Sequence, residues 1–321
     1  MSTDMDGIAV AGSILVDKIN SISAYPREGE LTHIRALSSA VGGCVPNTAI
    51  DIKKLDSTIP VYAFGRVGQD KEGDFAVSEM ERAGVICSRI VRSDSPTSFT
   101  EVMSVTSGQR TFFTYPGASA EFGLPDMPDA LPGMLHLGYF LLLDRVDRGD
   151  GLEILRWAKS RGVRTSIDLV SENSERYSAV LPCLEYTDNL IINETEAGKL
   201  AGLSPARENL CDIAAALMAR GVRERVIIHM PRLAVCLSRD GYTESPSYIL
   251  PDGFIKGTTG AGDAFCAGAL IGIYRGYSDR DILEVGAAAA VSALSEESGT
   301  AGVLPLDAAL AAVRNFPRYS V

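Results

Sequence analysis

The chain has 321 residues, of which 46% are hydrophobic and 22% are charged, an ordinary globular composition with ample apolar material for a core. No uninterrupted apolar stretch approaches the roughly 18–20 residues that span a bilayer, and the polar, acidic start at 1–6 does not have the pattern of a signal peptide. The net charge of −11 argues against binding to nucleic acid or to an anionic membrane, although a local site can still hold phosphate. Six scattered cysteines without a C-x-x-C pair, and only three histidines, predict neither a structural zinc site nor a disulfide framework, and indicate a cytoplasmic protein.

The first part of the chain alternates between strand and helix patterns. In chain order it predicts a strand at 7–16 ending at Asp17, a polar turn-rich stretch at 20–39, a helix at 46–55, a strand at 60–67 and a helix at 70–83. Gly84 ends the last of these helices.

A different pattern follows, in which no helix separates the strands. Short β-branched or aromatic runs occupy 85–91, 98–106 and 110–115, and 107–109 is typical of a hairpin turn. The segments 18–39 and 95–117 therefore predict a small β-sheet that projects from the main domain and could act as a lid.

From about residue 134 the chain returns to a regular alternation. Strands are predicted at 134–140, 164–170, 189–193 and 225–229, and helices at 151–159, 194–201, 210–220, 262–274, 280–295 and 306–315. This rhythm predicts a three-layer, Rossmann-like α/β fold, with a mostly parallel sheet between helices and one domain over 1–321.

The strongest chemical signal is the run Gly257-Thr258-Thr259-Gly260-Ala261-Gly262-Asp263-Ala264-Phe265. Its small residues let the backbone approach a ligand, and the apolar run after it predicts a helix whose first N–H groups could bind an anion. Asp263 at that terminus could accept a proton from a substrate hydroxyl, as phosphoryl transfer requires. The alternative is a plain glycine-rich turn with Asp263 as a helix cap. No Gly-Lys-Ser/Thr follows, so the run is not a Walker A loop.

Four features together resemble the PfkB family of carbohydrate kinases, which has the ribokinase-like fold. The run 257–265 resembles the C-terminal signature of the family, and Val41-Gly42-Gly43-Cys44-Val45-Pro46-Asn47 resembles its N-terminal one. Asn193-Glu194-Thr195-Glu196 resembles its N-x-x-E motif, and Asp17 stands where the family places a substrate-binding Asp. The four matches follow the family's order and span nearly the whole chain.

The resemblance implies ATP-dependent phosphorylation of a hydroxyl on a small sugar or sugar derivative, with Mg²⁺. It implies that Asp263 is the base and that the anion hole is formed by Gly260, Ala261 and Gly262. It implies that the substrate is bound by Asp17, Gly42, Gly43 and Asn47. The nucleotide would be bound by Asn193 and Thr258, and the metal by Glu196. It also implies that the small sheet covers the sugar and can mediate a homodimer.

Each of these residues also has a purely structural interpretation. Asp17 could be a turn residue, Gly42-Gly43 a simple turn, and Asn47 a helix cap. Glu196 could merely favour the helix dipole. For three further residues a structural role is at least as well supported as a functional one. His136 is expected to be a core residue, and Asp168 to lie near the site without acting. Arg110 is either a solvated charge or a phosphate contact.

Two departures from the family pattern affect the cofactors. Gly257 stands where the family usually has Asp, which puts K⁺ activation in doubt. His229, Met230, Pro231 and Ala234 replace a glycine-containing pattern along the nucleotide. Because Pro231 fixes φ and lacks an N–H, we expect the nucleotide pocket to differ in shape from that of the family. Such a pocket could bind ATP weakly or take an unusual phosphate donor.

Two alternatives stay open at the level of the sequence. A nucleoside kinase of the same fold would need an aromatic slot, for which Phe112, Phe113 and Tyr115 are candidates. A non-catalytic sugar- or nucleotide-binding protein would keep the fold without turnover, and replacement of Asp263 by Asn separates this reading from an enzyme.

Overall fold

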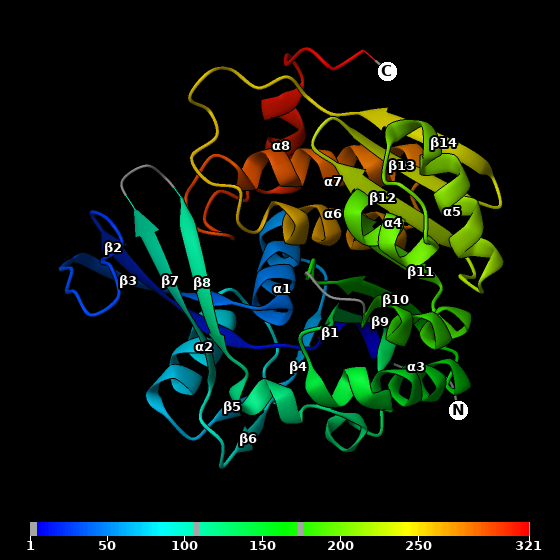
Figure 1. The fold of residues 1–321 in the computed structure, drawn as a ribbon. Helices are drawn as coiled ribbons and strands as arrows, with labels where there is room; N and C mark the ends of the chain where they lie inside the picture. The colour runs from blue at the N-terminus through cyan, green and yellow to red at the C-terminus, as the bar shows by residue number, and fades with distance from the viewer. Residues whose placement is uncertain (1–4, 106–108, 173–175, 321) are drawn as a thin grey trace.

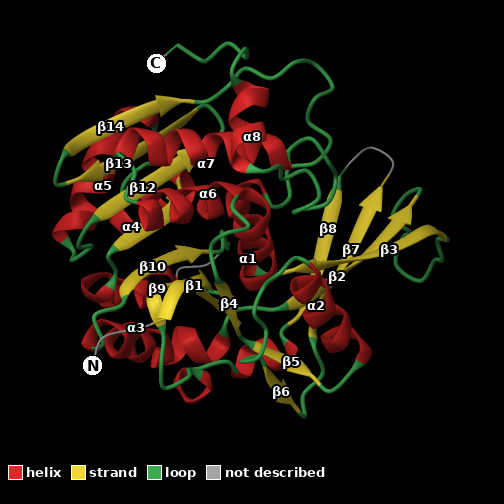
Figure 2. Ribbon diagram, turned by 180° about the vertical axis from the view of Figure 1, so that it is seen from behind, coloured by secondary structure: helices red, strands yellow, loops and turns green. Residues whose placement is uncertain are grey.

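The computed structural model describes residues 5–105, 109–172 and 176–320. Within them, an eight-stranded sheet is covered by helices on both faces, and a smaller four-stranded sheet stands to one side (Figures 1 and 2). The three-layer α/β fold predicted from the strand–helix rhythm is confirmed. The predicted turn at 107–109 lies largely outside the described residues.

The main sheet is parallel over most of its width. Its order is β14 (Gly241–Pro246), β13 (Leu233–Ser238), β12 (Arg225–Met230), β11 (Asn189–Asn193), β10 (Arg164–Leu169), β9 (Pro132–Phe140), β1 (Met5–Ala11) and β4 (Val61–Phe64). Neighbouring strands from β4 to β12 pair in parallel, while β13 pairs antiparallel with both β12 and β14. The carboxyl ends of the parallel strands therefore meet at one edge, where ligands bind in open α/β sheets.

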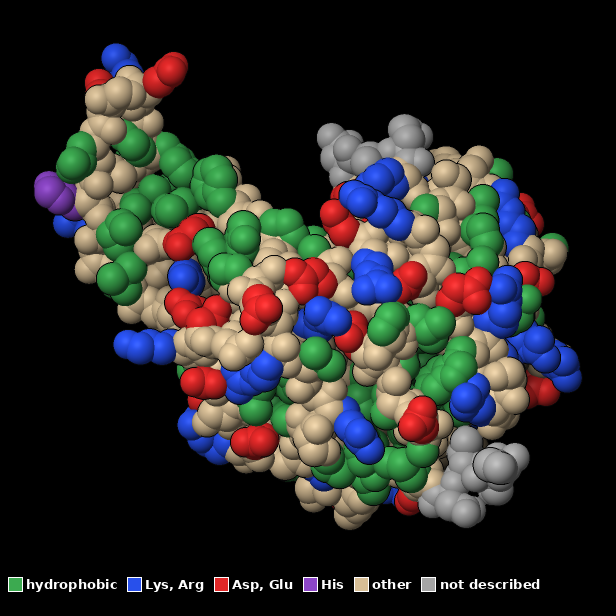
Figure 3. Space-filling model, turned by 90° about the horizontal axis from the view of Figure 1, so that it is seen from below, with side chains coloured by type: hydrophobic (Ala, Val, Ile, Leu, Met, Phe, Trp, Pro, Cys, Tyr) green, Lys and Arg blue, Asp and Glu red, His purple; other side chains and the backbone are tan. Residues whose placement is uncertain are grey.

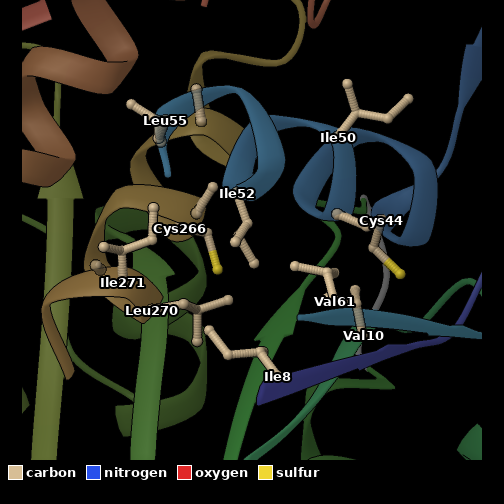
Figure 4. Close-up of a cluster of buried hydrophobic side chains, with 14 of the residues drawn as sticks. Ile8, Val10, Cys44, Ile50, Ile52, Leu55, Val61, Cys266, Leu270 and Ile271 are labelled. Carbon is tan, nitrogen blue, oxygen red and sulfur yellow. The ribbon is translucent and has the colours of Figure 1, made fainter. Parts of the chain in front are cut away.

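Alternate residues of β1 point to opposite faces of the main sheet and divide the core in two. Ile8 and Val10 pack with the helices of one layer, part of which Figure 4 shows, whereas Ala9 and Ala11 pack with the other layer. The first layer contains α1 (Cys44–Leu55), α2 (Lys71–Arg82) and α6 (Ala261–Arg275), with α7 (Asp279–Ala293) beside α6 and α8 (Leu306–Val313) packed on α7. The second contains α3 (Gly151–Ser160), α4 (Glu194–Ala201), α5 (Leu210–Ala219) and the 3-10 segment Arg176–Tyr186. Over the described part of the chain, no helix is both long enough and apolar enough to cross a bilayer.

The small sheet is built from the two segments that broke the strand–helix rhythm. Its order is β3 (Ile34–Gly42), β2 (Leu15–Ile22), β7 (Ser98–Val105) and β8 (Arg110–Tyr115), and a separate pair joins β5 (Arg66–Gly68) to β6 (Val91–Ser93). Figure 3 shows it as an arm that projects from the body and carries hydrophobic side chains on its surface. Leu31, Ile34, Leu37, Phe112 and Phe113 are exposed there.

The first predicted strand is in fact two strands that belong to different sheets. β1 ends at Ala11, and β2 begins at Leu15 after a bend at Gly12, whose φ is +142°. A side chain at Gly12 would come within 2.5 Å of the Cys44 sulfur, so the bend requires glycine. Asp17 therefore lies inside a strand of the small sheet rather than in a turn after a core strand.

Candidate active site

Two neighbouring cavities lie at the carboxyl ends of β9 to β12. The first has a volume of about 450 Å³ and lies between the main sheet and the small sheet, since its walls include Thr100 and Thr114 of the small sheet. The second, of about 540 Å³, lies between β12, α6 and α7. Their walls meet at four residues: Ser171, Asn193, His229 and Gly262. A molecule in one cavity would therefore face a molecule in the other across Gly262.

The residues predicted from the motifs gather at these two cavities. Those that line the first are Asp17, Gly43, Asn47, Asn193, Glu196, Gly260, Gly262 and Asp263, and those that line the second are Asn193, Thr258, Ala261 and Gly262. Gly42 is the exception, because it lines neither. A Cβ on Gly42 would lie 2.5 Å from Oδ2 of Asp17, so Gly42 leaves room for that carboxylate instead.

Asp263 lies in the first turn of α6 and is only 7% exposed. Asn47 on α1 donates from Nδ2 to Oδ2 of Asp263 at 2.9 Å. The hydroxyl of Tyr139, at the end of β9, donates to both carboxylate oxygens at 3.0 Å. Burial, reinforced by the nearby charge of Asp168, raises the pKa of Asp263 to about 7 despite these hydrogen bonds. A carboxylate with this pKa is well suited to act as a general base near neutral pH.

The N-terminus of α6 is open toward both cavities. Its cap residue, Gly260, is left-handed with φ +80°, and no side chain in the described structure caps the helix. A Cβ on Gly260 would lie 2.5 Å from the carbonyl oxygen of Gly299, so only glycine fits. Gly262, by contrast, is exposed and lines both cavities. Uncapped N–H groups at a helix N-terminus form an anion site, and here that site lies within one turn of Asp263.

Tyr139 is a site residue that none of the motifs marks. It has a left-handed backbone with φ +61°, which is rare for an aromatic residue. Its N–H donates to Oδ1 of Asp168 at 2.5 Å, so Asp168 holds the strained turn that aims the phenol at Asp263. The only sequence signal was its place at the carboxyl end of a parallel strand. His136, three residues earlier, is fully buried, as expected for a core residue.

Asp17 lines the first cavity from the small sheet, and Arg110 of the same sheet lies near it. Burial raises the pKa of Asp17 to about 6, and the nearby charge of Arg110 opposes this shift. Arg110 donates from Nη1 to Oγ1 of Thr259 at 2.9 Å. This contact ties strand β8 to the loop that precedes α6, so Arg110 is not simply a solvated charge.

Asn193 and Glu196 form a reciprocal cap at the start of α4. Oδ1 of Asn193 accepts from the N–H of Glu196 at 2.9 Å, and Oε2 of Glu196 accepts from the N–H of Asn193 at 3.1 Å. The hydroxyl of Ser171 donates to Oε1 of Glu196 at 2.7 Å. Burial raises the pKa of Glu196 to about 7. Both residues therefore cap α4, while Asn193 lines both cavities and Glu196 lines the first.

The segment that departs from the family pattern forms a wall of the second cavity. Met230, Pro231 and Ala234 line it together with apolar residues of α7. The ring of His229 packs on Phe265 with centroids 4.8 Å apart, and burial lowers the pKa of His229 to about 4, so the ring is neutral at pH 7. This cavity therefore offers an apolar slot beside the open end of α6.

Comparisons with known proteins agree with this geometry. A family described as pfkB family carbohydrate kinase matches residues 5–305. The chain is similar to a ribokinase of Arabidopsis thaliana, with 27% identity over 88% of this chain and 74% of the relative. It is also similar to an adenosine kinase of Saccharomyces cerevisiae, with 26% identity over 85% of this chain and 83% of the relative.

Solved structures show the same fold. The Arabidopsis thaliana ribokinase complexed with ribose and ATP matches with a TM-score of 0.81 at 22% identity, covering 98% of this chain and all of that one. A ribokinase of Thermotoga maritima matches with a TM-score of 0.80 at 19% identity, covering 97% of this chain and all of that one. The predicted ribokinase-like fold is confirmed. Because the family match spans nearly all of the sequence, the chain belongs to the pfkB family of carbohydrate kinases, which are phosphotransferases with a hydroxyl acceptor.

Proposed function

We propose that the protein transfers the γ-phosphoryl group of ATP to a hydroxyl of a small sugar or sugar derivative. One observation carries this proposal: a buried carboxylate, Asp263, lies beside an uncapped helix N-terminus where two cavities meet. In this arrangement, the first cavity holds the acceptor and the second holds the nucleotide. The kinase relatives, among them the ribokinase and the adenosine kinase described above, support phosphoryl transfer as the reaction.

The proposed chemistry takes place across Gly262. Asp263 accepts the proton of the acceptor hydroxyl. The oxygen of that hydroxyl attacks the γ-phosphorus, and the bond from phosphorus to the bridging oxygen of ADP breaks. N–H groups of Gly260, Ala261 and Gly262 stabilise the charge on the transferred group. Asp17, Gly43 and Asn47 bind acceptor hydroxyls, while Gly42 acts through the room it leaves for Asp17.

Mg²⁺ and K⁺ fit the site differently. Mg²⁺ prefers oxygen ligands and keeps several waters, and it would neutralise charge on the phosphates. Both oxygens of Glu196 already accept hydrogen bonds, so Glu196 and Asn193 fit a role in orienting those waters better than direct ligation. Gly257 packs against the backbone of 296–297 and offers no carboxylate to a monovalent cation, so the dependence on K⁺ is tested directly in the screen below.

The small sheet has two roles in this proposal. It closes over the acceptor, with Arg110 as its contact to the loop before α6. Its exposed apolar side chains, such as Leu37 and Phe113, form the kind of surface that a second copy of the chain would cover in a dimer. The described cysteines are all unpaired, which fits a cytoplasmic enzyme.

A nucleoside is the second candidate acceptor. Phe112 lines the first cavity, whereas Phe113 is its neighbour on a strand and points to the other face of the small sheet. The ring of Phe112 could stack on a base, and the similarity to the Saccharomyces cerevisiae adenosine kinase gives this candidate weight.

An ATP-consumption screen tests the proposal. Sugars, sugar acids and nucleosides are offered one by one with Mg²⁺, with and without K⁺. Turnover with a sugar or sugar acid supports the proposal, and turnover with nucleosides alone favours the second candidate. If no acceptor stimulates ATP consumption, although calorimetry shows that ligands bind, the protein is a non-catalytic binding protein and the proposal is wrong.

A further inference from the structure

Three buried side chains from three elements converge beneath the first cavity. They are His136 on β9, Asp168 at the end of β10 and Cys266 on α6, with exposed fractions of 0%, 7% and 2%. Nε2 of His136 lies 3.5 Å from Oδ2 of Asp168 and 3.7 Å from the sulfur of Cys266. All three ligand atoms lie within 4.8 Å of one another.

The two separations from Nε2 of His136 are close to those of a tetrahedral zinc site. Bond lengths of about 2.0–2.3 Å at tetrahedral angles place the ligand atoms roughly 3.3–3.7 Å apart. The two measured separations fall in this range without any movement of the backbone. A histidine nitrogen, a thiolate and a carboxylate are also ligands that Zn²⁺ prefers, whereas Mg²⁺ prefers oxygen alone.

The surrounding contacts leave the inward-facing atoms for an ion. Nδ1 of His136 is hydrogen-bonded to Oγ of Ser166 at 2.9 Å, and Oδ1 of Asp168 accepts from the N–H of Tyr139. His136 and Asp168 thus each have one further atom engaged by the protein, as outer-shell contacts do in known metal sites.

Charge and access are also suitable. A thiolate and a carboxylate balance a divalent ion, so the occupied site is neutral, which burial requires. Asp168 and Cys266 both line the first cavity. That cavity provides a path of entry and a fourth position for water or for an acceptor hydroxyl.

We propose that His136, Asp168 and Cys266 form a three-ligand site for a thiophilic divalent metal ion of the Zn²⁺ class in the floor of the first cavity. The site is separate from Glu196 and its expected Mg²⁺. It does not depend on the identity of the acceptor or on ATP-dependent turnover.

Titration of the metal-free protein with Co²⁺ tests the proposal, because Co²⁺ reports its ligands by absorption. We expect one equivalent to produce the intense visible bands of tetrahedral Co²⁺ and a thiolate charge-transfer band, both of which one equivalent of Zn²⁺ abolishes. Cys266→Ser, which keeps the size of the side chain, should lose the charge-transfer band. Ser166→Ala should weaken binding by about 10–100-fold, the usual effect of losing an outer-shell contact.

Cys211→Ser is the matched control, since Cys211 is the exposed cysteine and lies outside the cluster. It should leave the spectrum unchanged. Asp168→Asn is a second ligand variant, and thermal unfolding without metal verifies that each variant is folded. The proposal is wrong if wild-type protein gives no tetrahedral bands, if the thiolate charge-transfer band survives in Cys266→Ser, or if either kind of band disappears in Cys211→Ser.

Discussion

The carboxylate of Asp263 is held by two neighbours of different origin. Asn47 belongs to a recognisable glycine motif, whereas Tyr139 belongs to none, yet both donate to Asp263. A hydrogen bond to a carboxylate stabilises its charged form, so the Tyr139 hydroxyl lowers the pKa of Asp263 against the larger effect of burial. The strained backbone of Tyr139 costs about 1–3 kcal/mol, which suggests a role beyond packing.

Tyr139→Phe should therefore raise the pKa of Asp263 above its present value of about 7. The base form would then be lost at a higher pH, so the acidic limb of the kcat profile should move upward while the ring packing is kept. The pH dependence of kcat for wild type and variant measures this shift. Tyr62→Phe, which removes a hydroxyl from a half-buried tyrosine packed in the other core layer, is the control. An acidic limb that stays in place in Tyr139→Phe would show that the phenol does not act on Asp263.

At this scale, the sequence predicts the residues that motifs contain and misses those that the fold supplies. Asp263, Asn47 and Gly262 could be placed because small residues and a carboxylate at a helix start have a direct chemical meaning. The contribution of Tyr139 depends on a left-handed turn that Asp168 holds from a neighbouring strand. No local pattern encodes that contact.

At the scale of elements, the start of α6 contains two glycines with different requirements. Gly260 needs its left-handed backbone and has Gly299 against it, whereas a Cβ on Gly262 would meet only Cε1 of His229 at 3.6 Å. The first glycine is thus required by the fold. Gly262 has room for a methyl group as far as its protein neighbours are concerned, and it lies where the two cavities meet.

Gly262→Ala should fold as the wild type does, with an unchanged melting temperature. Its kcat/KM for ATP should fall by about tenfold or more, because the methyl group stands between the phosphate and the N–H groups. Gly260→Ala is the matched variant and should lower the melting temperature. Thermal unfolding and steady-state kinetics measure both effects. Wild-type kinetics in Gly262→Ala would contradict the assignment of the anion site.

Helix α1 contains a buried acid that is unrelated to its glycine motif. Both carboxylate oxygens of Asp51 are buried and have no hydrogen-bond partner within the described residues. Burial and the nearby charge of Asp263 raise the pKa of Asp51 well above its ordinary value. A raised folded-state pKa means that the unfolded chain binds fewer protons than the folded one, so Asp51 lowers stability as the pH rises above about 4.

Asp51→Asn should remove this penalty because the amide does not ionise. Its advantage over wild type in free energy of unfolding should grow with pH, by at most about 1.4 kcal/mol per pH unit. Urea unfolding at pH 5 and pH 8 measures the difference. Asp252→Asn, at an exposed aspartate, is the control and should show little pH-dependent advantage. An advantage for Asp51→Asn that is equal at both pH values would contradict the account of Asp51.

At the scale of the whole molecule, two sheets and two cavities define the site. The strand–helix rhythm was enough to predict the main sheet, and the break in that rhythm was enough to predict the small one. The antiparallel strands β13 and β14 were not predicted; β14 is the edge strand and half of its residues are polar, so it has no clear strand pattern. The cavities could not be predicted either, since their walls come from segments as distant as Leu15 and Cys266.

The central claim is that Asp263 is the base for transfer of phosphate between the two cavities. The most direct measurement is kcat for Asp263→Asn beside wild type, with the best acceptor from the screen, phosphorylated product quantified by mass spectrometry, and acceptor affinity measured by calorimetry. We predict that kcat falls by about 10²–10⁴-fold, the usual contribution of a general base, while the dissociation constant of the acceptor changes little. Turnover near the wild-type value in a folded Asp263→Asn protein would contradict the claim.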